Sequence, residues 1–200
     1  MGQNGRIPRL ALHLFTSGEL ILSRLPFAFW LIPASPAYES FAEIIRDLAR
    51  QYEAVPFEPH VTFFVGENHP QETLLRLGAE LAQTHPPLTL TGQVVNFSAS
   101  FFKTVFVAFF DDPILTSLYR QTAVALDDHA YRLDPHMSLI YKNTAVSTKK
   151  KIIQSLKYEL STVPFDTIKL VFPNPETGDF ADIGGWRIVH SWKLGEGGDG

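Results

Sequence analysis

Apolar residues follow two spacings along the chain, and the spacing changes repeatedly. A continuous apolar run from Phe27 to Ile32 indicates a buried β-strand. Apolar residues then recur every three or four positions over 41–52, which is typical of a helix, and a second strand is predicted at 60–65. A helix over 70–81 and a β-rich segment over 88–97 follow. The first half therefore predicts the order strand, helix, strand, helix, strand.

The second half of the chain repeats this order. Its predicted elements are a strand at 104–110, a helix at 113–126, a strand at 136–141, a helix at 147–160, and strands at 165–172 and 186–194. Equivalent positions are separated by a nearly constant interval, as His60 and His136 or Pro36 and Pro113 show. We call the interval from His60 to His136 the repeat offset. Such a repeat indicates a duplicated unit. The predicted fold class is therefore α+β, with two pseudo-symmetric lobes of antiparallel sheet and flanking helices around a central cleft.

The two ends of the chain differ from the part between them. We treat residues 1–25 as an N-terminal extension, 26–194 as a single bilobal domain, and the glycine-rich residues 195–200 as a disordered tail.

Short polar residues at helix starts accept hydrogen bonds from free backbone N–H groups. The predicted N-caps on this basis are Ser35, Asp112 and Ser147.

The composition limits the chemistry that is available. Of the 200 residues, 45% are hydrophobic, which is enough to build a packed core. The chain has no cysteine, which excludes disulfides, thiolate metal sites and a cysteine nucleophile. A formal net charge of −4 opposes binding of long nucleic acids, although a small nucleotide remains allowed. No run approaches the roughly 20 apolar residues of a membrane helix. We expect a soluble, cytoplasmic monomer without membrane contact.

Two octapeptides give the strongest indication of function. They are FEPHVTFF at 57–64 and LDPHMSLI at 133–140. Both read apolar, acidic, proline, histidine, apolar, hydroxyl, apolar, apolar. One copy alone is compatible with an ordinary half-buried strand, but two copies at the repeat offset indicate a shared role. Because side chains at i and i+2 lie on one face of a strand, His60 is expected beside Thr62, and His136 beside Ser138.

Two imidazoles and two hydroxyls in one cleft suit phosphate-ester chemistry. With a pKa near 6.5, one histidine can be neutral and accept a proton from water while the other is protonated and donates to the leaving oxygen. The hydroxyls can hydrogen-bond the non-bridging phosphate oxygens. The histidines have no metal-binding spacing of the His-x-His or His-Glu-x-x-His type. We therefore expect no metal and no cofactor.

The paired motifs resemble the signature of the two-histidine phosphoesterase superfamily, also called the RNA-ligase-like phosphodiesterases. Finer features are similar to its cyclic phosphodiesterase branch, and the resemblance covers roughly residues 25–194. These features are Phe29–Pro33, Glu58–Thr62, Phe101–Lys103 and His136–Tyr141. The resemblance implies metal-independent opening of small nucleotide-like cyclic phosphates, either nucleoside 2′,3′-cyclic phosphates or ADP-ribose 1″,2″-cyclic phosphate. It implies the catalytic residues His60 and His136 and the substrate-binding residues Thr62, Ser138, Trp30 and Tyr141.

The resemblance also suggests a division of roles. The cyclic phosphodiesterase branch forms a 2′-phosphate, so the 3′ oxygen leaves. We assign His136 as the general base for water and His60 as the general acid for that oxygen. Trp30 is expected to stack on the nucleobase of the substrate. The alternative functions are an RNA-end-processing phosphodiesterase, which the acidic charge opposes, and a non-catalytic nucleotide-binding module, which the intact motifs oppose.

Several neighbouring residues allow more than one interpretation. Glu58 and Asp134 either orient the histidines or form turns, and turn formation is favoured because each precedes a proline. Phe101 and Phe102 either cover a base or fill the lobe interface. The lysine run 149–151 is interpreted as a solvated helix start. Trp186 and Trp192 are interpreted as core residues of the last strand rather than as binding residues.

Overall fold

The computed structural model describes residues 26–156, 158–159 and 161–195. The predicted order of elements is confirmed, and so is the α+β class. The strands are β1 (Phe27–Pro33), β2 (Val61–Gly66), β3 (Leu88–Phe97), β4 (Val105–Phe109), β5 (His136–Ile140), β6 (Thr162–Phe172) and β7 (Arg187–Lys193). The helices are α2 (Ala37–Tyr52), α3 (Gln71–Thr84), α4 (Pro113–Leu126) and α5 (Val146–Ser155), with 3-10 turns η1 (Phe101–Lys103) and η2 (Ile183–Gly185).

The proposed extension 1–25 and most of the proposed tail lie outside the described residues. Gly195 was assigned to the tail, but its backbone N–H donates to the carbonyl of Ala82 at 2.9 Å. This hydrogen bond joins the end of β7 to helix α3, so the folded part extends to Gly195.

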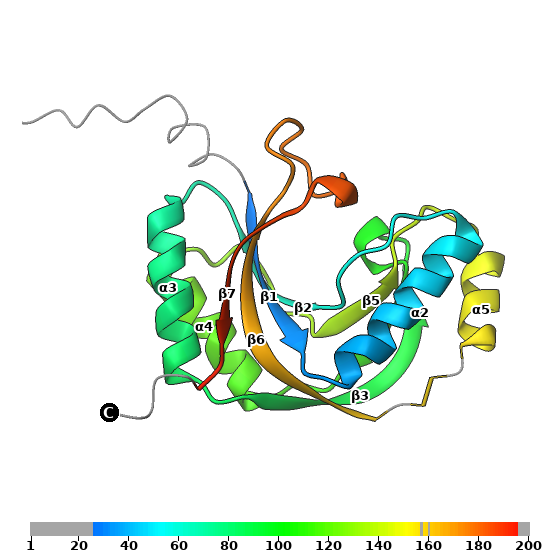
Figure 1. Ribbon diagram of the computed structural model, residues 1–200, viewed down its shortest axis with the longest axis horizontal. Coiled ribbons are helices and arrows are strands. Elements are labelled where there is room, and N and C mark those ends of the chain that lie inside the picture. Colours follow the sequence, from blue (N-terminus) through cyan, green and yellow to red (C-terminus); the bar gives the residue numbers. More distant parts are fainter. Residues whose placement is uncertain (1–25, 157, 160, 196–200) are drawn as a thin grey trace, which may run out of the picture.

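Within the described residues, seven strands form one antiparallel sheet in the order β1-β2-β5-β4-β3-β6-β7. Because β6 also pairs with β1, six of these strands close into a ring. Helices α3 and α4 lie at one end of the molecule, and α2 and α5 lie at the other (Figure 1). The sequence suggested a separate sheet for each lobe. The strands β3 and β6, of 10 and 11 residues, are long enough to pair with each other and join the halves.

The strand registers show the internal repeat directly. Trp30 pairs with Thr62 between β1 and β2, and Phe106 pairs with Ser138 between β4 and β5. The repeat offset relates Trp30 to Phe106 and Thr62 to Ser138. The registers shift at Phe29/Trp30 and at Val105/Phe106, which are related in the same way. Strands β2 and β5 meet where Val61 faces Met137, its equivalent in the second half. The pseudo-two-fold axis therefore passes between the two histidine motifs.

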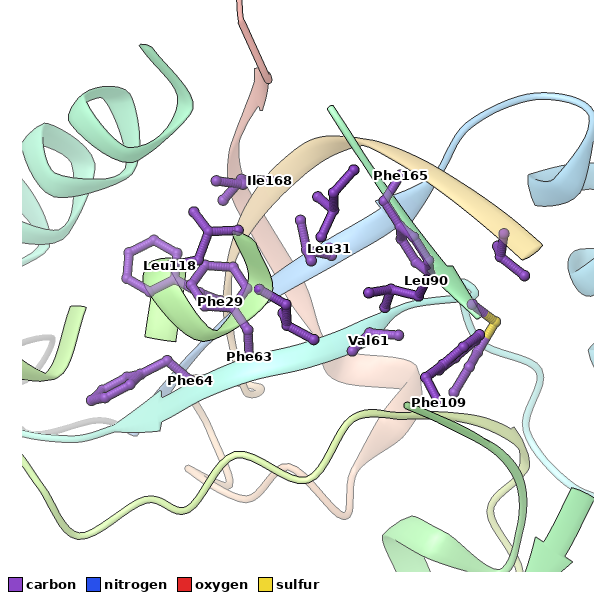
Figure 2. Close-up of a cluster of buried hydrophobic side chains, with 14 of the residues drawn as sticks. Phe29, Leu31, Val61, Phe63, Phe64, Leu90, Phe109, Leu118, Phe165 and Ile168 are labelled. Atoms are coloured by element: carbon purple, nitrogen blue, oxygen red, sulfur yellow. The ribbon is translucent and has the colours of Figure 1, made fainter. Parts of the chain in front are cut away.

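Alternation along β1 separates the core from the site. Phe27, Phe29 and Leu31 are fully buried in the main hydrophobic core. Figure 2 shows Phe29 and Leu31 in this core beside side chains from β2 and β6, and Phe29 stacks on Phe63 at a centroid distance of 5.7 Å. Ala28 and Trp30 belong to a second, smaller apolar cluster. The face of β1 and β2 that points away from the main core therefore carries Trp30, His60 and Thr62.

One of the three predicted helix caps is confirmed. Asp112 accepts hydrogen bonds from Ile114 N and Leu115 N at 2.9 Å, with Pro113 in the first turn. The N-caps of α2 and α5 are Pro36 and Ala145 instead of the predicted Ser35 and Ser147.

The lysine run 149–151 is not uniformly solvated, contrary to the sequence interpretation. Lys149 is 6% exposed, and its Nζ donates to the Ser98 carbonyl at 2.7 Å. The long side chain therefore ties α5 to the end of β3. The helix itself ends at Ser155, earlier than predicted.

Candidate active site

The two motif histidines meet in one cavity of about 240 Å³. His60 stands directly before β2 and His136 opens β5, on either side of the place where these strands pair. The cavity is lined by five of the six predicted site residues, namely His60, His136, Thr62, Trp30 and Tyr141. The sixth, Ser138, is buried, and its hydroxyl donates to the Phe102 carbonyl at 2.7 Å.

Both imidazoles are held in the same tautomer by the backbone. The Nδ1 of His60 lies 2.6 Å from the Glu58 carbonyl, and the Nδ1 of His136 lies 2.6 Å from the Asp134 carbonyl. A carbonyl oxygen only accepts, so each Nδ1 carries a proton and each Nε2 is left as the exchangeable nitrogen. The acid-Pro-His sequence thus orients the ring through the carbonyl of the acidic residue rather than through its carboxylate.

The carboxylate of each motif forms an ion pair with a lysine. Glu58 Oε1 accepts from Lys169 Nζ at 2.5 Å and from Tyr38 Oη at 3.2 Å. Asp134 pairs with Lys103, and its Oδ2 lies 3.9 Å from His136 Nδ1. The first pair is largely buried, whereas the Asp134 side chain is 59% exposed. Each histidine therefore has a carboxylate–lysine pair nearby, and the pair beside His136 is more exposed to solvent than the pair beside His60.

An aromatic ring packs against each histidine. Trp30 stacks on His60 at 3.7 Å between centroids and 10° between planes. Phe106 contacts His136 edge-on at 5.5 Å. Phe106 was missed in the sequence, although it is the equivalent of Trp30 in the second half and the repeat offset identifies it. Because His60 covers one face of Trp30, that face cannot stack on a substrate base.

Burial keeps both histidines neutral in the free protein. Desolvation lowers the pKa of His60 to about 3, with smaller contributions from His136 and Lys169. Desolvation also lowers the pKa of His136. Burial raises the pKa of Tyr141, so its hydroxyl stays protonated and donates toward His60 Nε2, 3.4 Å away. Near neutral pH each Nε2 therefore presents a lone pair.

This burial predicts a pH-dependent stability. The folded protein resists protonation of His60, whereas the unfolded chain binds a proton below pH 6.5, so the free energy of unfolding falls as pH drops from 6.5 toward 3. Between pH 6 and pH 4 we expect His60 to contribute a loss of roughly 2–3 kcal/mol. Urea unfolding at several pH values should show a flatter dependence for His60→Gln than for wild type. An unchanged slope would contradict the burial of a neutral His60, and the exposed-site variant His129→Gln serves as control.

The cavity is also lined by residues that were not expected there from the sequence. Trp186 precedes β7, lines the cavity, and meets Trp30 edge-on at 5.1 Å, so its assignment as a core residue is corrected. Its Nε1 donates to the Phe180 carbonyl at 2.7 Å, and Phe180 lines the cavity too. By contrast, Trp192 packs against the main core as predicted.

Phe101 and Phe102, the two phenylalanines before β4, differ in position. Phe102 is 39% exposed and lines the cavity. Phe101 stacks on Tyr141 at 6.0 Å and 28°. Tyr131, also a wall of the cavity, donates its hydroxyl to the Thr62 carbonyl at 3.2 Å. Neither this tyrosine nor its contact could be read from the sequence, because it comes from a loop before the second motif.

Among the described residues, no three His, Cys, Asp or Glu side chains gather in the way a metal ion requires. In the same part of the chain, none of the helices is long and apolar enough to cross a membrane.

Comparison with known families decides the assignment. The cyclic phosphodiesterase-like protein family matches residues 25–163, which include both histidine motifs. The chain belongs to this family. The predicted membership of the two-histidine phosphoesterase superfamily is thereby confirmed. No curated protein matches the chain.

Solved structures share the fold of this family member. Crystal structures of E. coli LigT with phosphate and with 3′-AMP match with TM-scores of 0.52 and 0.54 and identities of 16% and 14%. TT0787 of Thermus thermophilus matches with a TM-score of 0.52 at 14% identity. Each match covers 86% of this chain and 98% of the other. At these identities the likeness shows the fold.

Proposed function

We propose that the protein hydrolyses a nucleotide-like 2′,3′-cyclic phosphate to a monophosphate, the 2′-phosphate, by proton transfer through His60 and His136. The observation that carries the proposal is the pair of imidazoles in one cavity, each with Nδ1 bonded to a backbone carbonyl and Nε2 left to exchange protons. The ligands of LigT, phosphate and 3′-AMP, support a phosphate group of a nucleotide as the bound species.

The proposed reaction needs one proton acceptor and one donor. His136 Nε2 accepts a proton from water while the water oxygen bonds to phosphorus. The bond from phosphorus to the 3′ oxygen breaks, and that oxygen takes a proton from His60 Nε2. Thr62, in the cavity wall, hydrogen-bonds a non-bridging oxygen. Ser138 contributes a second hydrogen bond after its hydroxyl turns from the Phe102 carbonyl.

The role of His60 as acid requires that substrate binding protonates it. A pKa of about 3 means that charging His60 in the free protein costs about 5 kcal/mol relative to water. A phosphate anion about 4 Å away offsets about 4 kcal/mol at an effective dielectric constant of about 20. Trp30 already stacks on His60 in the free protein, so its cation–π attraction acts before substrate binds and adds nothing to this offset. The imidazolium therefore forms only with a bound phosphate.

The proposal is tested with 2′,3′-cyclic AMP and purified protein in the presence of a chelator. We expect full turnover and 2′-AMP as the product, because the histidines supply the proton transfers without a Lewis acid. Product isomers are separated by chromatography. Loss of turnover that one divalent ion restores would contradict metal independence. Turnover confined to RNA with a cyclic phosphate end would favour RNA-end processing, and binding without turnover would favour a nucleotide-binding module.

A further inference from the structure

A charged side chain lies buried on the face of β6 that points away from the main core. Ile168 and Leu170 are fully buried in that core, and Lys169 between them is on the opposite face of the strand. Lys169 pairs with Trp30 of β1, which runs beside β6 in Figure 1. Its side chain is only 16% exposed, although lysine is rarely buried without a partner. The role of Lys169 therefore depends on the group that meets its charge.

Glu58 is that group, and three separate segments meet at its carboxylate. Its Oε1 accepts from Lys169 Nζ at 2.5 Å and from Tyr38 Oη of α2 at 3.2 Å. Its Oε2 is buried and has no hydrogen-bond partner among the described residues. A buried ion pair adds little net stability, and an unpartnered buried oxygen is destabilising. Stability alone therefore does not account for this pair.

The pair acts on the backbone that holds His60. Residues 54–60 belong to no helix or strand, so no ladder of backbone hydrogen bonds fixes the Glu58 carbonyl that accepts from His60 Nδ1 at 2.6 Å. The Glu58 side chain ties this segment to β6 and α2 instead. Because Glu58 precedes Pro59, its backbone angles are restricted as well. Holding the carboxylate in place thereby holds the carbonyl of the same residue.

The second half of the chain lacks an equally buried anchor. The Asp134 carbonyl also lies 2.6 Å from a histidine Nδ1, but the Asp134 side chain is 59% exposed and its partner Lys103 belongs to η1. Exposed ion pairs contribute little, because water solvates both charges. His60 is therefore held more firmly than His136.

We propose that Lys169 is a positioning residue for His60: through Glu58 it keeps the proton on Nδ1 and Nε2 facing the cavity. Lys169 is not among the residues that line the cavity, so it acts through Glu58 rather than on the substrate. This inference rests on the proposed function only for its effect on turnover. The family match ends at residue 163, so it includes Glu58 and His60 but not Lys169.

Imidazole ¹⁵N spectra of the free protein report the tautomer without any turnover. In wild type we expect His60 to carry its proton on Nδ1. In Lys169→Met the Glu58 carbonyl is no longer held, and we expect at least roughly one-tenth of the His60 rings to carry the proton on Nε2. The His136 signals should stay as in wild type and serve as an internal control. Lys193→Met removes a more exposed ion pair to Asp166 of β6 and should leave both histidines unchanged.

A double variant covers the case in which Lys169→Met does not fold. Glu58→Ala combined with Lys169→Met removes both charges, so no buried charge is left unpaired, and the backbone carbonyl at position 58 remains. The same appearance of the Nε2 tautomer of His60 is expected. A folded double variant with the proton wholly on Nδ1 would overturn the inference, and so would an unchanged His60 in folded Lys169→Met.

Kinetics separate the positioning role from the proposed function. With 2′,3′-cyclic AMP we expect the kcat of Lys169→Met to fall about 10- to 100-fold, because His60 is misplaced, and its KM to stay within about twofold of wild type. Lys169→Arg keeps the positive charge, offers further N–H donors to Glu58 Oε2, and should keep the wild-type tautomer and kcat. A change confined to KM would overturn the positioning role. A tautomer change in a protein that does not hydrolyse the substrate would overturn the proposed function alone.

Discussion

Replacement of His60 or His136 by alanine is expected to lower the turnover of 2′,3′-cyclic AMP by a factor on the order of 10²–10⁴. Each histidine supplies an Nε2 to the same cavity, so loss of either removes one of the two proton transfers. Steady-state kinetics at saturating substrate would measure the effect. A large loss in kcat rather than in KM is expected, because the proton moves in the transition state.

Controls for this pair must separate chemistry from folding. His60 also packs on Trp30, so His60→Gln should be compared with His60→Ala, and both should be checked for a cooperative unfolding transition. His129→Ala, at an exposed position, should keep wild-type turnover. A folded His60→Ala or His136→Ala variant with full turnover would contradict the two-histidine mechanism.

A sulfur leaving group should rescue the variant that lacks the general acid. Thiolates leave without protonation far more readily than alkoxides, so a substrate with sulfur at the 3′ bridging position no longer needs the acid. We expect His60→Ala to regain about 10²-fold in turnover on this substrate, in line with the contribution of a general acid. Release of thiol is followed with a thiol reagent, which is possible because the protein has no cysteine of its own.

The rescue experiment distinguishes the two role assignments. His136→Ala should stay impaired on the sulfur substrate, since water still needs a base. Rescue of His136→Ala instead of His60→Ala would reverse the roles. Rescue of neither variant would mean that both histidines act beyond proton transfer, for example by binding the phosphate.

Much of the fold could be predicted from the spacing of apolar residues and from the residues that begin and end helices and strands. The β3 bounds and the Asp112-Pro113 helix start were predictable because a local pattern or a single cap decides them. The duplicated motif placed both histidines, and the repeat offset applied to Trp30 would also have identified Phe106. The closure of the sheet by β6 was not predictable, because pairing partners depend on contacts between distant segments.

The part of the site contributed by the β6–β7 loop was beyond sequence reasoning. Trp186 begins the strand predicted at 186–194, which favoured a core position, and only the path of the loop brings it to the cavity. The buried Lys149 illustrates the same limit, since its partner is the backbone carbonyl of Ser98, far away in the sequence. Glu58 orients His60 through its carbonyl, a role that depends on local geometry rather than on charge.

Nuclear magnetic resonance of the imidazole nitrogens shows whether His60 and His136 share one phosphate site. The protein is labelled with ¹⁵N at histidine and titrated with 2′-AMP, and the signals are assigned with His60→Gln and His136→Gln. We expect protonated Nδ1 in both rings before titration and movement of both Nε2 signals with one common midpoint. Movement of a single Nε2 signal, or two separate midpoints, would contradict one phosphate site shared by His60 and His136.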